Sequence, residues 1–96
     1  MDRNGYNPSI LDTEQGICYI CGAHTETARH EIFFGTANRK LSKKYGTWVN
    51  LCPWCHHLAH NNAETTKFLH IRGENAFKDK YPDIDFKSFY GRNFDI

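Results

Sequence analysis

Hydrophobic residues in this chain form short clusters separated by polar residues and glycines, which predicts several short elements rather than one long helix or strand. Glu31–Phe34, closed by Gly35, predicts a strand that ends in a turn. Alternating β-forming residues over Thr47–Leu51 predict a second strand that pairs with the first. Between the two strands, Thr36–Tyr45 predicts a short helix, because Gly46 follows it directly.

Helices are expected in the second half of the chain. Pro53 suits the first turn of a helix that breaks at Asn61-Asn62. Asn62 can then cap a longer helix that runs to about Tyr81, before Pro82. One apolar stripe on this longer helix is expected to pack against the first half of the chain, and it consists of Phe68, Leu69, Ala76, Phe77 and Tyr81.

The end of the chain predicts one more short helix. Asp83 is a candidate cap for it, and Gly91 is a candidate end. The aromatic residues of this segment, together with a tail that folds back as an anchor, are Phe86, Phe89, Tyr90, Phe94 and Ile96.

Length and composition indicate a single small domain. The chain has 96 residues, which we divide into a core over residues 10–60 and a helical extension over residues 61–96, with the folded part beginning near Ile10. Its net charge is +1, so any nucleic-acid surface is local rather than global. The start of the chain lacks the apolar run of a signal peptide, and no stretch approaches the roughly 20 apolar residues of a membrane span. We expect a soluble, cytoplasmic protein with no membrane partner.

Two Cys-x2-Cys pairs lie about thirty residues apart, a spacing typical of a four-thiolate zinc site. Gly22 after the first pair suits the tight turn that presents two sulfurs to one ion. Two disulfides are the alternative in a secreted protein, but a reducing compartment favours metal. The sequence therefore predicts a structural Zn²⁺ held by Cys18, Cys21, Cys52 and Cys55.

The chain has six histidines, and a closed four-cysteine zinc site requires none of them. His56 and His60 are four residues apart and share one helix face, so they are candidate ligands of a second, catalytic divalent ion. Alternatively, His56 is a substitute zinc ligand and His60 stabilises the helix end. His57 points about 100° away from His56 and is expected to face solvent or DNA. His30 sits on or beside the first strand.

Four basic residues occur within six positions, with no acidic residue among them. Such a run is often only a solvated face, but here it lies between the two predicted strands, where a phosphate backbone would pass. The candidate nucleic-acid-binding residues are Arg39, Lys40, Lys43 and Lys44.

These motifs together resemble one known family. The segments Arg29–Lys40, Lys44–Gly46 and Leu51–His56 resemble the zinc-knuckle form of the HNH endonucleases, also called ββα-metal or His-Me finger nucleases. The tail Phe89–Phe94 is similar to that of small HNH proteins from bacteriophages and prophages. The resemblance implies an α+β fold, a small treble-clef ββα-metal domain with a four-cysteine zinc site and C-terminal helices.

The same resemblance implies an activity: a metal-dependent endonuclease that hydrolyses DNA phosphodiester bonds, with nicking the simplest outcome for one active site. Its cofactors would be the structural Zn²⁺ and one catalytic divalent cation, Mg²⁺ or Mn²⁺. A phage origin would place the protein in the host cell cytoplasm, with DNA and a phage or host DNA-processing protein as partners.

The resemblance leaves two assignments open for the His30-Glu31 pair. In one, His30 is a metal ligand and Glu31 is the general base; in the other, His30 is the base and Glu31 lies on the opposite face of the strand. The asparagine that orients the base is also displaced, so that Asn38 and Asn50 compete for this role. We prefer Asn38, because it lies in the Gly-x2-Asn-Arg-Lys run that resembles the phage proteins.

Two non-catalytic alternatives follow from these departures. A chain that has lost the usual base and asparagine would be a zinc-stabilised DNA-binding module. A protein-interaction module would instead present an exposed aromatic surface built from Phe86, Phe89, Tyr90 and Phe94.

Overall fold

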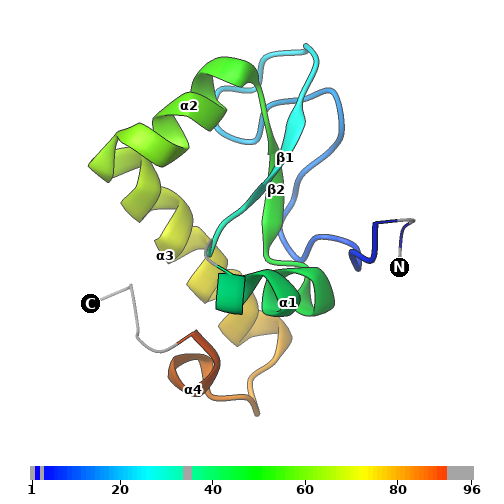
Figure 1. The fold of residues 1–96 in the computed structure, drawn as a ribbon, viewed down its shortest axis with the longest axis vertical. Coiled ribbons are helices and arrows are strands. Elements are labelled where there is room, and N and C mark those ends of the chain that lie inside the picture. The colour runs from blue at the N-terminus through cyan, green and yellow to red at the C-terminus, as the bar shows by residue number, and fades with distance from the viewer. Residues whose placement is uncertain (1, 3, 34–35, 91–96) are drawn as a thin grey trace.

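The computed structural model describes residues 2, 4–33 and 36–90, and its architecture is α+β, which confirms the predicted fold class at that level (Figure 1). A two-stranded sheet and helices make up the fold. In chain order, the elements are β1 (Ala28–Glu31), α1 (Thr36–Tyr45), β2 (Trp48–Leu51), α2 (Pro53–Asn61), α3 (Ala63–Lys80) and α4 (Phe86–Tyr90).

The two strands form an antiparallel pair, with α1 between them at one end and α2 leaving β2 at the other (Figure 1). In the register, His30 lies opposite Val49 and Glu31 lies opposite Trp48. Because neighbouring side chains on a strand point to opposite faces, the pair has a His30 face and a Glu31 face. The His30 face meets α2, since the His30 and His56 rings are in contact.

The first strand lies earlier in the chain than the sequence predicts. Strand pairing covers Ala28–Glu31, and Ile32 and Phe33 lie outside it, so the prediction of a strand from Glu31 onward is wrong; Phe34 falls outside the described residues. Ile32 and Phe33 leave the strand in a bend and are fully buried. Their apolar character reflects close packing beneath α3: a Cβ atom at Gly73 would lie 2.9 Å from Ile32 Cγ2 and 3.0 Å from Phe33 Cζ.

The helix boundaries predicted around the strands are confirmed. Helix α1 covers Thr36–Tyr45, and Gly46 ends it with a φ of +72°, a conformation that favours glycine. Pro53 occupies the first turn of α2. Asn62 caps α3, because its side-chain oxygen accepts a hydrogen bond of 2.9 Å from the backbone N–H of Thr65.

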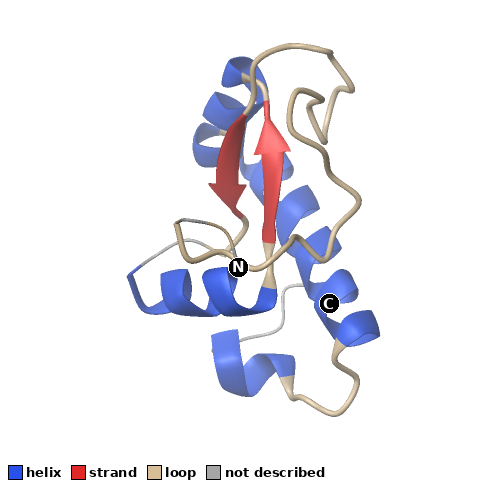
Figure 2. Cartoon of the chain, turned by 90° about the vertical axis from the view of Figure 1, so that its right-hand side faces the viewer, coloured by secondary structure: helices blue, strands red, loops and turns tan. Residues whose placement is uncertain are grey.

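Helix α3 runs along one side of the strand pair and supplies much of the core (Figure 2). Leu69, Gly73 and Phe77 recur every four residues and are buried, as the predicted stripe requires. Phe68 does not belong to that stripe: it lies about 100° round the helix from Leu69 and is 39% exposed. Its ring instead contacts the guanidinium of Arg72, 5.0 Å from the ring centroid.

Two of the three aromatic residues of α4, Phe86 and Tyr90, pack into the core. Phe86 is 1% exposed and Tyr90 is 6% exposed, whereas Phe89 is 36% exposed. The Tyr90 hydroxyl shares a hydrogen bond of 3.0 Å with Thr47 Oγ1. The remaining tail predictions, on Gly91, Phe94 and Ile96, fall outside the described residues.

Asp85, rather than Asp83, caps α4. Its carboxylate accepts hydrogen bonds from the backbone N–H of Lys87 at 3.2 Å and from Ser88 Oγ at 2.7 Å. Asp85 immediately precedes the first helical residue, as a capping residue must, whereas Asp83 lies in the turn before it.

The segment before Ile10 also packs on the strand pair, on its Glu31 face. Asn7 O accepts a hydrogen bond of 2.9 Å from Trp48 Nε1. The Arg29 guanidinium lies 4.0 Å from the centroid of the Tyr6 ring and 4.5 Å from that of Trp48. The packed part of the chain therefore includes Tyr6 and Asn7, which precede the expected start near Ile10.

Within the described part of the chain, no helix combines the length and apolar character needed to cross a membrane.

Candidate metal centres

Two chain segments bring the four cysteines together. Cys18 and Cys21 lie in a tight turn, in which Gly22 has a φ of +75° and donates a hydrogen bond of 2.9 Å to Cys18 O. Cys52 directly follows β2 and caps α2, and its sulfur accepts a hydrogen bond of 3.4 Å from the backbone N–H of Cys55. The four sulfur atoms lie within 4.8 Å of one another, and we call these residues the cysteine cluster.

The cysteine cluster fits a tetrahedral metal ion. Cys21 Sγ and Cys52 Sγ are 3.9 Å apart, and Zn–S bonds of about 2.3 Å place the sulfurs of a tetrahedral site about 3.8 Å apart. All four cysteines are free thiols in the structure. The donor set is compatible with zinc, and the four cysteines are positioned as the sequence predicts.

The electrostatics of the cluster favour a bound cation. Burial raises the pKa of the Cys18 thiol, but backbone hydrogen bonds at Cys21 and Cys52 outweigh it and bring the pKa to about 6. Burial and the neighbouring thiols raise the pKa of Cys55 well above its ordinary value. Four thiolates therefore do not coexist without a compensating positive charge.

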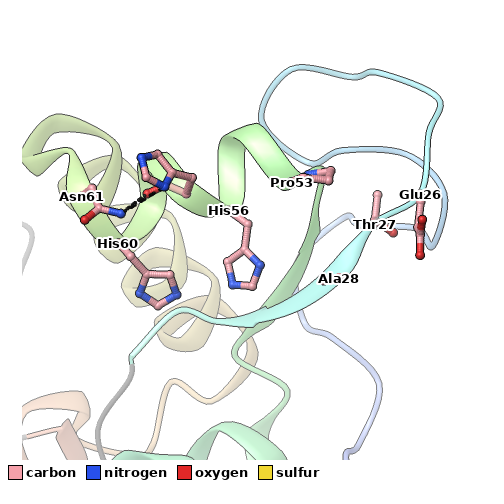
Figure 3. A pocket seen from close by; sticks show the side chains of 8 residues that line it. Glu26, Thr27, Ala28, Pro53, His56, His60 and Asn61 are labelled. Carbon is pink, nitrogen blue, oxygen red and sulfur yellow. Dashed lines mark hydrogen bonds between the residues drawn. The ribbon is translucent and has the colours of Figure 1, made fainter.

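Three histidines form a second cluster from two different elements. His30 comes from β1, whereas His56 and His60 come from one face of α2 and point toward the strands (Figure 3). The ring centroids are 5.2 Å apart for His30 and His56, 4.9 Å for His30 and His60, and 5.1 Å for His56 and His60. One nitrogen of each ring lies within 4.8 Å of the others, and we call these residues the histidine trio.

The three histidines of the trio differ in how deeply they are buried. His30 is 3% exposed, His56 is half-buried and His60 is exposed. Burial, together with the smaller effect of the nearby charges of His56, His60 and His70, lowers the pKa of His30 to about 3. Burial also lowers the pKa of His56. Neutral imidazoles offer lone pairs, which is the form in which histidine binds metal ions.

The histidine trio has the donor set of an open metal site. Catalytic sites typically use three protein ligands and leave a further position for water or substrate. A cavity of about 590 Å³ lies beside the trio and includes His56 and His60 in its lining. The three histidines could therefore hold an ion that a ligand in the cavity reaches.

Glu31 lies away from the histidine trio. Its carboxylate accepts a hydrogen bond of 2.9 Å from the Tyr6 hydroxyl and pairs with Arg39 Nε at 3.4 Å. Both contacts lie on the Glu31 face of the strand pair, opposite His30. The geometry supports one part of each assignment left open by the sequence. His30 lies with His56 and His60, as a candidate metal ligand would, whereas Glu31 lies on the opposite face of the strand.

The two candidate asparagines lie in different places. Asn50 pairs with Arg29 in the register, so its side chain lies on the face opposite His30. This position does not suit a residue that orients His30. Asn38 lies in the first half of α1 and is half-buried, and its role stays a prediction.

The predicted basic residues gather on α1, which contains no acidic residue. Arg39 and Lys43 are one turn apart, as are Lys40 and Lys44. Arg39 pairs with Glu31, and Lys43 Nζ lies 5.2 Å from the Tyr6 ring centroid. Helix α1 lies across the end of the strand pair opposite the start of α2 (Figure 1).

Several residues near the trio were not singled out as site residues from the sequence. Glu26, Thr27 and Asn61 line the cavity, and Trp54 is 66% exposed at the start of α2. Of these residues, only Trp54 could have been singled out from the sequence, because it lies between two residues of the cysteine cluster. His57 is exposed, as the sequence predicts.

The chain matches no protein-family model, no curated protein and no solved structure in comparisons with known proteins.

Proposed function

We propose that this chain is a metal-dependent DNA endonuclease of the HNH type, with a treble-clef ββα-metal core. The observation that supports the proposal is that three imidazoles, from β1 and α2, lie together in a chain whose four cysteines could already hold a structural zinc. A protein that needed metal only for stability would not require both.

The donor atoms suggest which ion each site takes. Four thiolates favour Zn²⁺, which we assign to the cysteine cluster. Imidazole nitrogens suit transition-metal ions, among which Mn²⁺ binds most weakly, whereas Mg²⁺ prefers oxygen ligands. Of the two catalytic ions expected from the resemblance, Mn²⁺ is therefore the better fit to the histidine trio. A divalent ion bound there would polarise a phosphate ester and lower the pKa of a bound water.

The chain's own residues would position the substrate. His30 is held rigidly by burial, while the exposed side of His60 leaves the trio open toward the cavity. The basic residues of α1 would contact the phosphate backbone, which adds affinity without base preference. Glu31 is engaged by Tyr6 and Arg39, away from the histidine trio, so we do not assign it as the acceptor of the proton of the attacking water.

The orientation of Glu31 favours one second candidate, a zinc-stabilised DNA-binding module without catalysis. In that case the histidine trio would bind metal but lack a proton acceptor. The protein-interaction module has less support, because Phe86 and Tyr90 are core residues rather than an exposed aromatic surface.

A plasmid-nicking assay tests the proposal. Zinc-loaded protein is incubated with supercoiled DNA and no added ion, Mg²⁺ or Mn²⁺, and the parent is compared with His30→Ala and His24→Ala. His24 is an exposed loop residue, so its variant is a matched control for loss of an imidazole.

The expected result is Mn²⁺-stimulated formation of open circles by the parent and His24→Ala, and none by His30→Ala at equal zinc content. A gel shift of the same DNA without open circles under any condition would support the binding module. Nicking by His30→Ala at the parent's rate would show that the histidine trio is not the active site.

A further inference from the structure

The cavity beside the histidine trio is large enough for part of a substrate. Its volume is about 590 Å³, which lies in the range of about 300–1,000 Å³ typical of ligand sites. Its walls come from the loop that leads into β1 and from α2 (Figure 3). A molecule in this cavity would lie directly against His56 and His60.

An aromatic surface adjoins the cavity. Trp54 is the most exposed of the large hydrophobic residues in the described part of the chain, at 66%. Its ring stacks on His57, with centroids 5.9 Å apart and planes 20° apart, and His57 lines the cavity. By contrast, Trp48 is half-buried, and its indole N–H is bonded to Asn7 O. Of these two indoles, Trp54 is the one that a flat ligand can reach.

The polar groups of the cavity suit a nucleobase better than a phosphate. Glu26 places a carboxylate in the lining, and a carboxylate repels phosphate oxygens but accepts hydrogen bonds from the N–H groups of a base. Thr27 and Asn61 add further polar groups to the lining. The phosphate of the same nucleotide would then lie toward the imidazoles rather than toward Glu26.

We propose that this cavity and the Trp54–His57 surface bind an unpaired base of single-stranded DNA, next to the phosphodiester that the histidine trio receives. This inference rests on the proposed nuclease function and names its substrate class: DNA with a single-stranded segment, such as a flap, gap or overhang. Bases in an intact duplex are stacked on one another and offer no free face to an aromatic side chain, whereas every unpaired base does.

Binding of oligonucleotides tests this inference without any cleavage. Zinc-loaded protein without added Mn²⁺ is titrated with a single-stranded oligodeoxycytidylate of about 10 nucleotides and with the matched duplex. Affinity is measured by the anisotropy of a label on the DNA, and contact is measured by quenching of tryptophan fluorescence. A denaturing gel verifies that the DNA stays intact.

Two variants separate stacking from folding. Trp54→Ala removes the aromatic ring and is expected to weaken single-strand binding roughly 5- to 100-fold, with much less effect on the duplex. Trp54→Phe keeps an aromatic ring, so it should retain most of the affinity. It should lose the quenching of tryptophan fluorescence, because Trp48 is then the one tryptophan left in the chain. Zinc content and circular dichroism verify that both variants are folded.

Single-strand affinity and quenching that are unchanged in Trp54→Ala would overturn the inference, as would equal loss of duplex and single-strand binding. The two proposals can fail separately. Absence of nicking together with Trp54-dependent binding would refute the nuclease and keep the single-strand site. Nicking together with Trp54-independent binding would support the nuclease and refute the single-strand site.

Discussion

At the residue scale, burial is the main reason that the pKa of His30 is low. This histidine is 3% exposed, and its pKa falls to about 3. His60, its neighbour across the trio, is exposed. The histidine trio therefore has a buried end, which fixes its geometry, and an open end, where water or substrate could enter.

Glu31→Gln tests whether Glu31 acts as a general base. Its carboxylate is engaged by Tyr6 and Arg39 on the face opposite His30, so we expect nicking to stay within about tenfold of the parent. Loss of a general base typically costs about 100- to 10,000-fold in rate. Initial rates on supercoiled DNA would measure the difference.

Tyr6→Phe is the matched control, because it removes the hydrogen bond to Glu31 but keeps the carboxylate. A loss of more than about 100-fold in Glu31→Gln alone would contradict this placement and restore Glu31 as the base.

Tyr90 should make the fold sensitive to alkaline pH. Burial raises the pKa of its hydroxyl from 10.0 to about 12, so the fold favours the neutral phenol. The unfolded chain ionises first as the pH rises. The stabilisation is therefore complete below about pH 10 and is lost between about pH 10 and pH 12, by at most about 2–3 kcal/mol.

Urea unfolding at a series of pH values, for the parent and Tyr90→Phe, would check this expectation. The variant loses the hydroxyl contact with Thr47 at every pH, but its stability should fall less steeply across the alkaline window. Parallel curves for the two proteins would contradict it.

At the element scale, local signals explain which predictions succeeded. Helix α2 was predictable because its start at Pro53 and the spacing of His56 and His60 are properties of one short segment. The Asn62 cap is local in the same way. The bounds of β1 were not predictable, because Ile32 and Phe33 are buried by α3 rather than by strand pairing, and no local pattern shows this.

Contacts between distant segments account for the rest. Glu74 is fully buried on α3, with its carboxylate 2.7 Å from Lys78 Nζ, although a charged residue in a helix usually predicts exposure. The cavity combines Glu26 with residues of α2, which share no spacing in the sequence. The sequence predicted the four cysteines of one candidate site and His56 and His60 of the other, but it left open the role of His30 and the orientation of Glu31, which depends on Tyr6.

Gly46 links α1, β2 and the N-terminal segment, and Gly46→Ala is expected to destabilise the fold strongly. Its φ of +72° costs a residue with a side chain about 1–2 kcal/mol. In addition, a Cβ atom there would overlap the backbone carbonyl of Pro8, and backbone cannot move aside as a side chain can. Thermal unfolding would measure the effect.

Gly16→Ala is the matched control, because Gly16 has a φ of +90° but nothing within 4 Å of an added Cβ. Gly16→Ala should lose only the stability that the positive φ costs, with no added steric overlap. Equal melting temperatures for the two variants would contradict the close approach of residue 8 to residue 46.

At the scale of the whole molecule, the cysteine cluster joins two halves of a small chain. Cys18 and Cys21 come from the N-terminal segment, whereas Cys52 and Cys55 come from the junction of β2 and α2. A 96-residue chain has a limited hydrophobic core, so a metal ion bound by the cysteine cluster would contribute a large share of its stability.

Removal of the metal from the cysteine cluster should therefore unfold the protein. Zinc binding contributes about 10–16 kcal/mol in small zinc-folded peptides, which exceeds or equals the roughly 5–15 kcal/mol net stability of typical domains. Circular dichroism before and after treatment with a strong chelator, and again after zinc is restored, would follow the change. An unchanged melting temperature in protein shown to be metal-free would contradict this role.

The proposed function requires two separate metal sites in this chain, one made of thiolates and one made of imidazoles. The most direct test is a Co²⁺ titration of zinc-loaded protein, followed by visible and near-ultraviolet absorption, for the parent and His30→Ala. The parent is expected to bind one further Co²⁺ without sulfur-to-cobalt charge-transfer absorption, whereas His30→Ala, with the same zinc content, is expected to bind none. No further Co²⁺ in the parent, or equal binding in the variant, would contradict this expectation.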